Sequence, residues 1–162
     1  MALRNPLVLG ADGLPQALQS GDTISSSVST ASIRQVTNGE ASAALPFGTP
    51  VYASAADTVK RAQANAKTTS KLAGLMYDAT TAAAAIGNVA ASGVLVGTTG
   101  QWDAVASTTG GLTFNTTYFL DPATPGKITA TPPTTSGQCN VVIGTAISPT
   151  ELELQIAQPI LL

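Results

Sequence analysis

The chain has 162 residues, a formal net charge of -2, only 10% charged residues and no histidine. Soluble domains usually carry roughly 25% charged residues, so we expect a surface of uncharged Ala, Thr, Ser and Gly that suits packing against other protein. The slight negative charge provides no positive field for a phosphate backbone, which argues against nucleic acid as a partner. The lack of histidine removes the usual general base of nucleophilic catalysis.

Residues 1 to 45 are predicted to form an N-terminal arm or hairpin that contacts other subunits. Leu7-Val8-Leu9 is a short apolar run that ends at a Gly-Ala-Asp-Gly turn. The Ser- and Thr-rich stretch from Ser25 to Ser32 fits either a linker or an exposed strand. The anchors that we expect on a neighbouring subunit are Leu7, Val8, Leu9, Leu14, Leu18 and Ile24. The alternative is that these residues complete the chain's own sheet.

Residues 46 to 162 are predicted to form an all-β body, a small antiparallel β-sandwich or barrel of jelly-roll type. Short apolar stretches alternate with Gly, Pro and Thr clusters, as in sandwiches and barrels. The candidate strands are 50–53, 72–77, 93–96, 102–106, 117–120, 127–131, 141–147 and 151–156. In the last of these, strict alternation places Leu152, Leu154 and Ile156 on one buried face.

Two segments need a choice between interpretations. Ala55 to Ala66 is Ala-rich and permits a helix, but its alternation also permits a strand, which we favour because its neighbours are strands. A turn of helix is expected near residues 68 to 71. Ala79 to Trp102 carries no charge, yet its four Gly residues and its Thr, Asn, Ser and Gln side chains predict short strands and a loop instead of a membrane span. Nothing at the N-terminus resembles a signal peptide, so we expect synthesis in a cytoplasm.

The residues that could carry chemistry have simpler structural explanations. Cys139 begins an apolar stretch and is expected in the core. Ser70 and Lys71 are adjacent and lack the spacing of a Ser-x-x-Lys nucleophile. The aspartates that lie beside turn residues, and are expected to accept hydrogen bonds from turns, are Asp12, Asp22, Asp78, Asp103 and Asp121. Gly-Thr-Thr-Gly at 97–100 and Gly110-Gly111 are expected to supply left-handed turn positions. We therefore predict no enzyme, no cofactor and no metal site.

Several strings spread over the chain resemble tailed-bacteriophage virion proteins. They are Asn5-Pro6-Leu7-Val8-Leu9, Gly13-Leu14-Pro15, Gln19-Ser20-Gly21-Asp22-Thr23-Ile24, Gly48-Thr49-Pro50-Val51-Tyr52, Leu72-Ala73-Gly74-Leu75, Tyr118-Phe119-Leu120-Asp121-Pro122, Pro125-Gly126-Lys127-Ile128-Thr129, Pro132-Pro133, Val142-Ile143-Gly144-Thr145-Ala146 and Leu152-Glu153-Leu154. Similar strings occur in head decoration (cement) proteins, head fibres and tail-fibre modules, which are β-rich and often trimeric. The resemblance implies a virion component and supplies no catalytic or ligand residue.

Within that resemblance, the absence of heptads and shaft repeats favours a cement protein over a fibre. We expect a homotrimer on the capsid exterior that binds between major capsid protein subunits and stabilises the shell, without nucleic acid or membrane as a partner. The alternative is a tail-fibre or head-fibre module that binds host surface glycan. Its candidate aromatics are Trp102, Tyr118 and Phe119, whose positions in predicted strands favour the core instead. An enzyme such as a depolymerase would need two carboxylates that meet in the fold.

Overall fold

A computed structural model describes residues 7–9, 15–17 and 31–162. Strands hold 44% of the residues and helices 9%, so the fold is all-β, as predicted. The elements are β1 (Leu7–Leu9), β2 (Pro15–Ala17), β3 (Ser32–Asn38), β4 (Leu45–Pro46), β5 (Pro50–Ala55), β6 (Thr58–Arg61), α1 (Lys67–Ser70), β7 (Leu72–Met76), β8 (Thr80–Thr81), β9 (Ile86–Val96), α2 (Thr99–Ala106), β10 (Thr117–Leu120), β11 (Ile128–Thr129), β12 (Cys139–Asn140), β13 (Val142–Ser148), β14 (Glu151–Leu154) and β15 (Ile160–Leu161).

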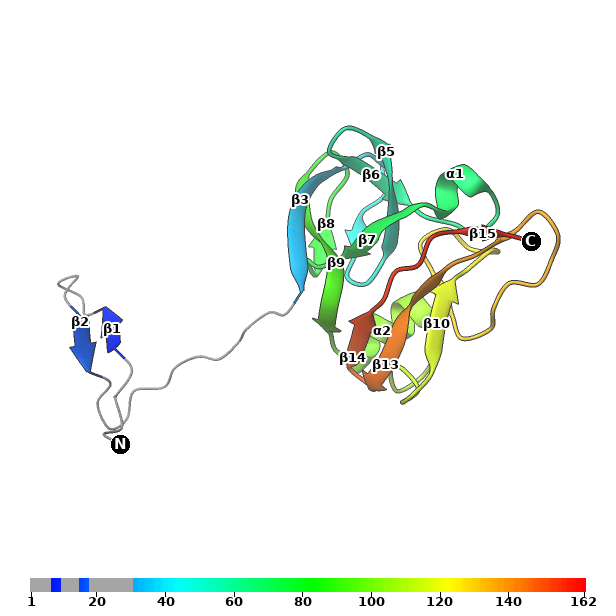
Figure 1. Ribbon diagram of the computed structural model, residues 1–162. Coiled ribbons are helices and arrows are strands. Elements are labelled where there is room, and N and C mark those ends of the chain that lie inside the picture. Colours follow the sequence, from blue (N-terminus) through cyan, green and yellow to red (C-terminus); the bar gives the residue numbers. More distant parts are fainter. Residues whose placement is uncertain (1–6, 10–14, 18–30) are drawn as a thin grey trace.

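Five strands close into a barrel in the order β9-β3-β6-β5-β7, because β7 pairs back to β9 (Figure 1). The closing contact is short and antiparallel, with Leu75 opposite Ala90 and Met76 opposite Val89. All pairs in the ring are antiparallel except β3 with β6, which is parallel. Closure gives each of the five strands a partner on both sides, whereas an open five-stranded sheet would leave two strands with only one partner.

Side chains of one cluster fill the barrel, since the interior of so small a barrel has room for little else. The buried members are Val36, Leu45, Val51, Val59, Met76 and Val89. The period-2 alternation of strands explains their places: Val51 is buried, whereas the next residue, Tyr52, lies outside the barrel and is half-buried. Four of the six members are valines, whose branched side chains suit packing within a sheet.

A second sheet continues from the end of the long strand β9. Ile86 to Ser92 of β9 pairs with β3, and Gly93 to Val96 pairs with β14, which leads to β13, β10 and β11. At the changeover Gly93 has φ of 90°, a conformation that other residues rarely adopt. One strand therefore belongs to both the barrel and the second sheet.

The second core lies against this sheet and the barrel wall, and helix α2 covers it. Trp102 of α2 is fully buried, and its ring meets that of Phe47 edge to face at 5.3 Å. The indole Nε1–H of Trp102 donates to the Thr150 carbonyl at 2.9 Å, so the polar end of the ring is satisfied inside the core. Tyr118, also buried, accepts a hydrogen bond from the Thr113 N–H at its hydroxyl.

Most predicted elements are confirmed with small shifts of their ends. Strands form in seven of the eight predicted segments, and the 55–66 segment contains strand β6, followed by the expected helical turn α1. Cys139 is buried, as are Leu152 and Leu154 of β14, while Ile156 is half-buried against the same core. Gly110 and Gly111 both have positive φ, as expected of turn positions.

The prediction of a strand at 102–106 is wrong, because these residues belong to helix α2. Thr98 and Gln101 form a reciprocal capping box that starts the helix, and this local signal outweighs the strand preference of Trp and Val. The expectation of left-handed turn positions at Gly97 and Gly100 is also wrong, because neither has a positive φ. Gly100 lies inside helix α2, and Gly97 directly precedes its N-cap, Thr98.

Part of the segment assigned to the arm lies in the barrel. Strand β3, at residues 32–38, is a full member of the ring, and β4 pairs with β8. The Ser- and Thr-rich composition upstream of Ile33 hid this strand, because such residues are equally common in linkers. Residues 25–30 of the Ser25 to Ser32 stretch lie outside the described residues.

Truncation of a barrel-core side chain should destabilise the whole fold. Met76→Ala removes a fully buried side chain at the closing strand, and we expect a loss of about 2–5 kcal/mol in the free energy of unfolding. Ile86→Ala, at a position that is 70% exposed, should change it by less than about 0.5 kcal/mol. Urea unfolding of both variants measures the difference, and equal losses would contradict the assignment of this core.

Candidate functional site

The predicted arm anchors fall into two groups in the structure. Leu7, Val8 and Leu9 form strand β1, which pairs with β2 in antiparallel register, with Val8 opposite Gln16. Among the described strands, β1 and β2 pair only with each other. The other predicted anchors, Leu14, Leu18 and Ile24, lie outside the described residues. The structure therefore brings the first three anchors into one hairpin.

One edge of strand β3 is a feature that the sequence reading missed. β3 pairs with β9 along Ser32 to Thr37, but β6 reaches only Thr37 and Asn38 on the other side. Residues Ser32 to Gln35 are exposed. Within the described part of the chain, this stretch of β3 has no strand on its second edge. Such an edge can accept a strand from another chain through backbone hydrogen bonds.

The body exposes several large apolar side chains. Those more than half exposed are Ile86, Val96, Phe114, Ile160 and Leu161. Ile160 and Leu161 make up strand β15, which pairs with β12 near Cys139. Val96 lies opposite Glu151 at the end of β9, close to the turn between β13 and β14. Ile160 and Leu161 are neighbours in the chain, whereas Ile86 and Val96 lie at opposite ends of β9 and Phe114 lies between α2 and β10.

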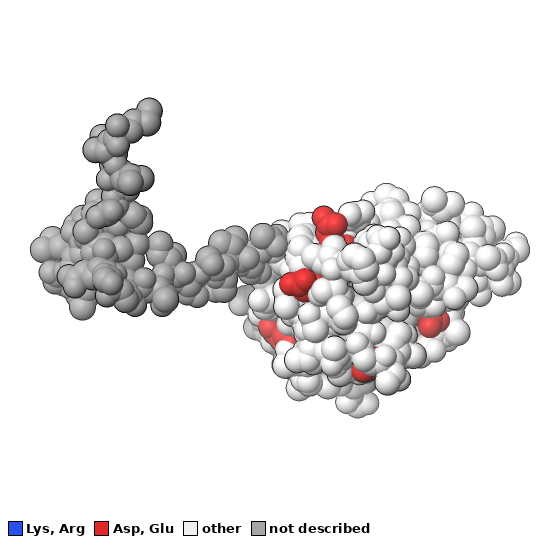
Figure 2. All heavy atoms as spheres, turned by 90° about the horizontal axis from the view of Figure 1, so that it is seen from below, with Lys and Arg blue, Asp and Glu red and all other residues white. Residues whose placement is uncertain are grey.

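Charge is sparse on the molecular surface. Figure 2 shows one face of the body, where small separate red areas of Asp and Glu lie in a broad white surface and no blue of Lys or Arg is visible. A surface of this kind has little charge to desolvate when another protein covers it. The composition-based expectation of an uncharged exterior is visible on this face.

The aromatic candidates for a glycan site do not form one. Trp102 and Tyr118 are almost completely buried, and Phe119 is half-buried in β10. The hydrogen bonds and ring contact of Trp102 and Tyr118 lie within the core, as predicted for these two residues, whereas Phe119 is not a member of the buried core. A ligand cannot stack on the Trp102 and Tyr118 rings, because the protein itself covers them.

The aspartates near turns accept hydrogen bonds from the backbone, as predicted. The Asp103 carboxylate accepts from the Gly111 N–H at 2.7 Å and the Gly110 N–H at 3.1 Å. Asp121 accepts from the Ala123 and Thr124 N–H groups. Asp78 accepts from the backbone and side chain of Asn88, across the start of β9. Asp12 and Asp22 lie outside the described residues.

The Ser70 hydroxyl, a possible nucleophile, is held in structural hydrogen bonds. The buried Ser70 hydroxyl lies 2.6 Å from the Ala66 carbonyl and 3.2 Å from that of Gln63, so it fastens helix α1 to the preceding turn. The residues that the structure describes contain no group of three or more His, Cys, Asp or Glu side chains placed to hold a metal ion. In the same residues, no helix has the length and apolar character to cross a bilayer.

Comparison with known proteins gives no family for this chain. No family model matches the sequence, and no curated protein matches it.

Acid should weaken the fold through Asp103. The hydrogen bond from the Gly111 N–H is the main reason that the pKa of Asp103 lies below its ordinary value of 3.8. Hydrogen bonds from the Gly110 N–H and the Thr108 hydroxyl also lower this pKa, whereas desolvation of the carboxylate raises it. The folded chain thus binds this proton less readily than the unfolded chain. The carboxylate stabilises the fold above pH 3.8, and that stabilisation is lost as the pH falls through the lowered pKa.

We therefore expect Asp103→Asn to lower the melting temperature at pH 7 and to lower it much less near pH ~2.5. Asp57→Asn is the matched control, because Asp57 is exposed in the turn between β5 and β6. Thermal unfolding followed by circular dichroism at the two pH values measures both variants. An equal loss of melting temperature for Asp103→Asn at both pH values would contradict stabilisation by the ionised Asp103 carboxylate.

Proposed function

We propose that this protein is a non-enzymatic virion component of a tailed bacteriophage, a decoration protein that binds the outside of the head between major capsid protein subunits. The observation that carries the proposal is a compact barrel body with few charges and exposed apolar side chains, joined in one chain to a separate small hairpin. The sequence strings that resemble phage virion proteins supply the biological setting.

Each structural part has a task in this proposal. The body associates around a three-fold axis with two further copies, where its uncharged surface is covered at small desolvation cost. The hairpin β1–β2 contacts neighbouring subunits, and the open edge of β3 can accept a strand from one of them. Repetition over many capsid positions converts weak single contacts into strong retention on the shell.

The direct test is binding of the purified full-length chain to undecorated phage heads. We expect co-sedimentation with the heads, saturation at a fixed ratio of copies to capsid protein, and ordered density on the capsid exterior by electron cryomicroscopy. Bound heads should withstand heating or osmotic shock better than bare heads. A chain that stays in the supernatant with every head tested would overturn the proposal, as would density confined to the tail.

The arm anchors can be tested in the same assay. Leu7→Asp combined with Leu9→Asp should weaken head binding by at least about tenfold, because burial of one leucine contributes about 1.5–3 kcal/mol. The melting temperature of the body should stay unchanged. Leu7→Met combined with Leu9→Met conserves side-chain volume and should bind nearly as well as the natural chain. Equal binding by the Asp and Met variants would show that β1 is not an anchor.

A further inference from the structure

Asn38, the last residue of β3, ties the loop after this strand and strand β8 together through its side-chain amide. Its Nδ2 donates to the Ala43 carbonyl and to the Thr81 carbonyl, both at 3.0 Å, and its Oδ1 accepts from the Glu40 N–H at 2.9 Å. The residue is only 1% exposed. An amide offers two donors and an acceptor on one short side chain, so it satisfies all three partners at once.

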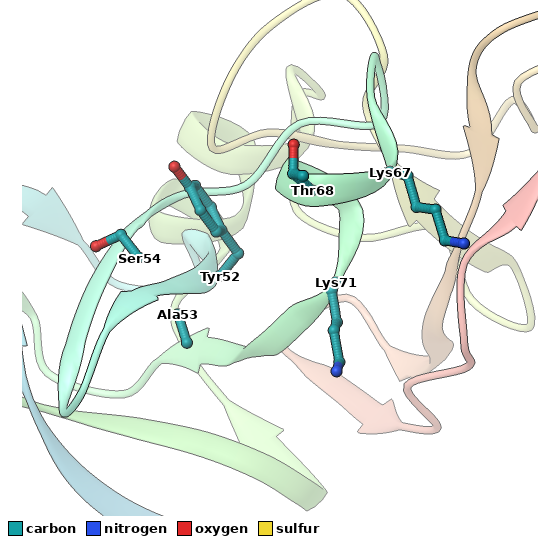
Figure 3. A pocket seen from close by; sticks show the side chains of 6 residues that line it. All are labelled: Tyr52, Ala53, Ser54, Lys67, Thr68 and Lys71. Atoms are coloured by element: carbon teal, nitrogen blue, oxygen red, sulfur yellow. The ribbon is translucent and has the colours of Figure 1, made fainter.

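The residue after Asn38 has no room for a side chain. A Cβ atom at Gly39 would lie 2.5 Å from Thr58 Cγ2 and 3.3 Å from the Val59 carbonyl oxygen, so a larger residue would push against β6. The Ser54 hydroxyl of β5 lies 3.5 Å from the same position. Figure 3 shows Ser54 in the lining of a surface hollow, on the far side of the Tyr52 ring from helix α1. Packing thus requires an Asn–Gly pair at the end of β3.

An Asn–Gly pair is prone to spontaneous loss of its side-chain amide, because glycine has no side chain to hinder attack by its own nitrogen. Base removes the Gly39 N–H proton, the nitrogen forms a bond to Asn38 Cγ, and the Cγ–Nδ2 bond breaks to release ammonia, which takes its last proton from water. Water then opens the succinimide ring to give aspartate or isoaspartate. Of the six asparagines in the sequence, only Asn38 precedes a glycine.

The folded chain opposes each part of this reaction. The Gly39 N–H donates to the Val59 carbonyl at 2.8 Å, which retains the proton and directs it at β6. The three hydrogen bonds of the amide hold Asn38 Cγ in place, and burial keeps out the base and water that the reaction needs. Attack therefore requires the end of β3 to open.

The product does not fit the place that the amide fills. An ionised carboxylate has no donor for the Ala43 and Thr81 carbonyls, and it would be buried against both of their oxygens. A protonated carboxyl has one donor for the two carbonyls. Isoaspartate also adds a carbon atom to the backbone, which disrupts the pairing of Asn38 with Val59.

From these features we infer that Asn38 and Gly39 form a self-modification site that is closed in the folded chain and open in the unfolded chain. A chain that folds promptly keeps its Asn38 amide. A chain that stays unfolded loses this amide irreversibly and leaves the pool that can fold and assemble. The pair is thus a timer on folding. This timer acts before any partner is bound, so it does not depend on the decoration role.

The experiment compares loss of the Asn38 amide in the purified full-length chain, in mildly alkaline buffer, with and without a denaturing concentration of guanidinium chloride. Trypsin releases residues 35–60, in which Asn38 is the only asparagine, and mass spectrometry follows the mass gain from amide to acid. We expect conversion at least about a hundredfold faster in guanidinium chloride, because the folded chain must open first. Equal rates in the two conditions would overturn the inference.

Gly39→Ala tests the chemistry apart from the fold, because its rate is measured only in guanidinium chloride. The added methyl group hinders attack by the nitrogen, so conversion of Asn38 should slow at least about tenfold. Equal rates for the natural and Gly39→Ala chains would contradict the succinimide route.

Asn38→Asp tests whether the product can still fold. Its equilibrium constant for folding, from guanidinium chloride unfolding, should be at least about tenfold smaller than that of the natural chain. Asn115→Asp makes the same chemical change in an exposed turn and should fold like the natural chain. Equal stability of the two variants would show that the modified chain is not excluded from folding. None of these measurements uses phage heads, so their outcome is separate from that of the decoration role.

Discussion

The pairing of β7 with β9 is the contact on which the rest of this structure depends. It closes the ring of five strands and holds Leu75 and Met76 on opposite sides of the barrel wall, one in each core. Without it, β7 and the barrel part of β9 would present open edges and the valine cluster would lose one wall. The second sheet begins at the other end of β9, where Gly93 to Val96 pair with β14. The two cores are thus coupled through one strand pair.

Sequence reasoning found the elements whose signal is local. The alternation of 151–156 predicts β14, and the turn aspartates Asp78 and Asp121 follow from their neighbours. It failed at α2, where Trp102 and Val105 resemble a strand and the deciding capping box lies upstream. Closure of the barrel was out of reach, because it joins distant segments and includes the parallel β3–β6 pair, which no turn signal announces.

The candidate sites also divide into those that the local sequence predicts and those that depend on strand pairing. The apolar residues of the arm are visible as a run in the sequence, and three of them do form a strand. The position of Leu72 opposite Tyr52 could not be predicted from the sequence, because the β5–β7 register sets it and no motif indicates that register. The open edge of β3 could not be predicted for a related reason. This edge is open because the parallel partner β6 pairs with only one end of β3, and no sequence motif indicates that pairing.

The place of the barrel strands along the chain also bears on how the protein acquires its shape during synthesis. Every strand of the ring lies before residue 97, so the barrel can close on the ribosome while the second sheet is still being translated. Until β13 and β14 emerge, Leu75, Ala90 and the ring of Tyr52 remain uncovered on its outer wall. Slow translation of residues 97–162 would prolong the lifetime of this intermediate with exposed apolar side chains, which is prone to aggregation. Rapid translation would shorten that lifetime.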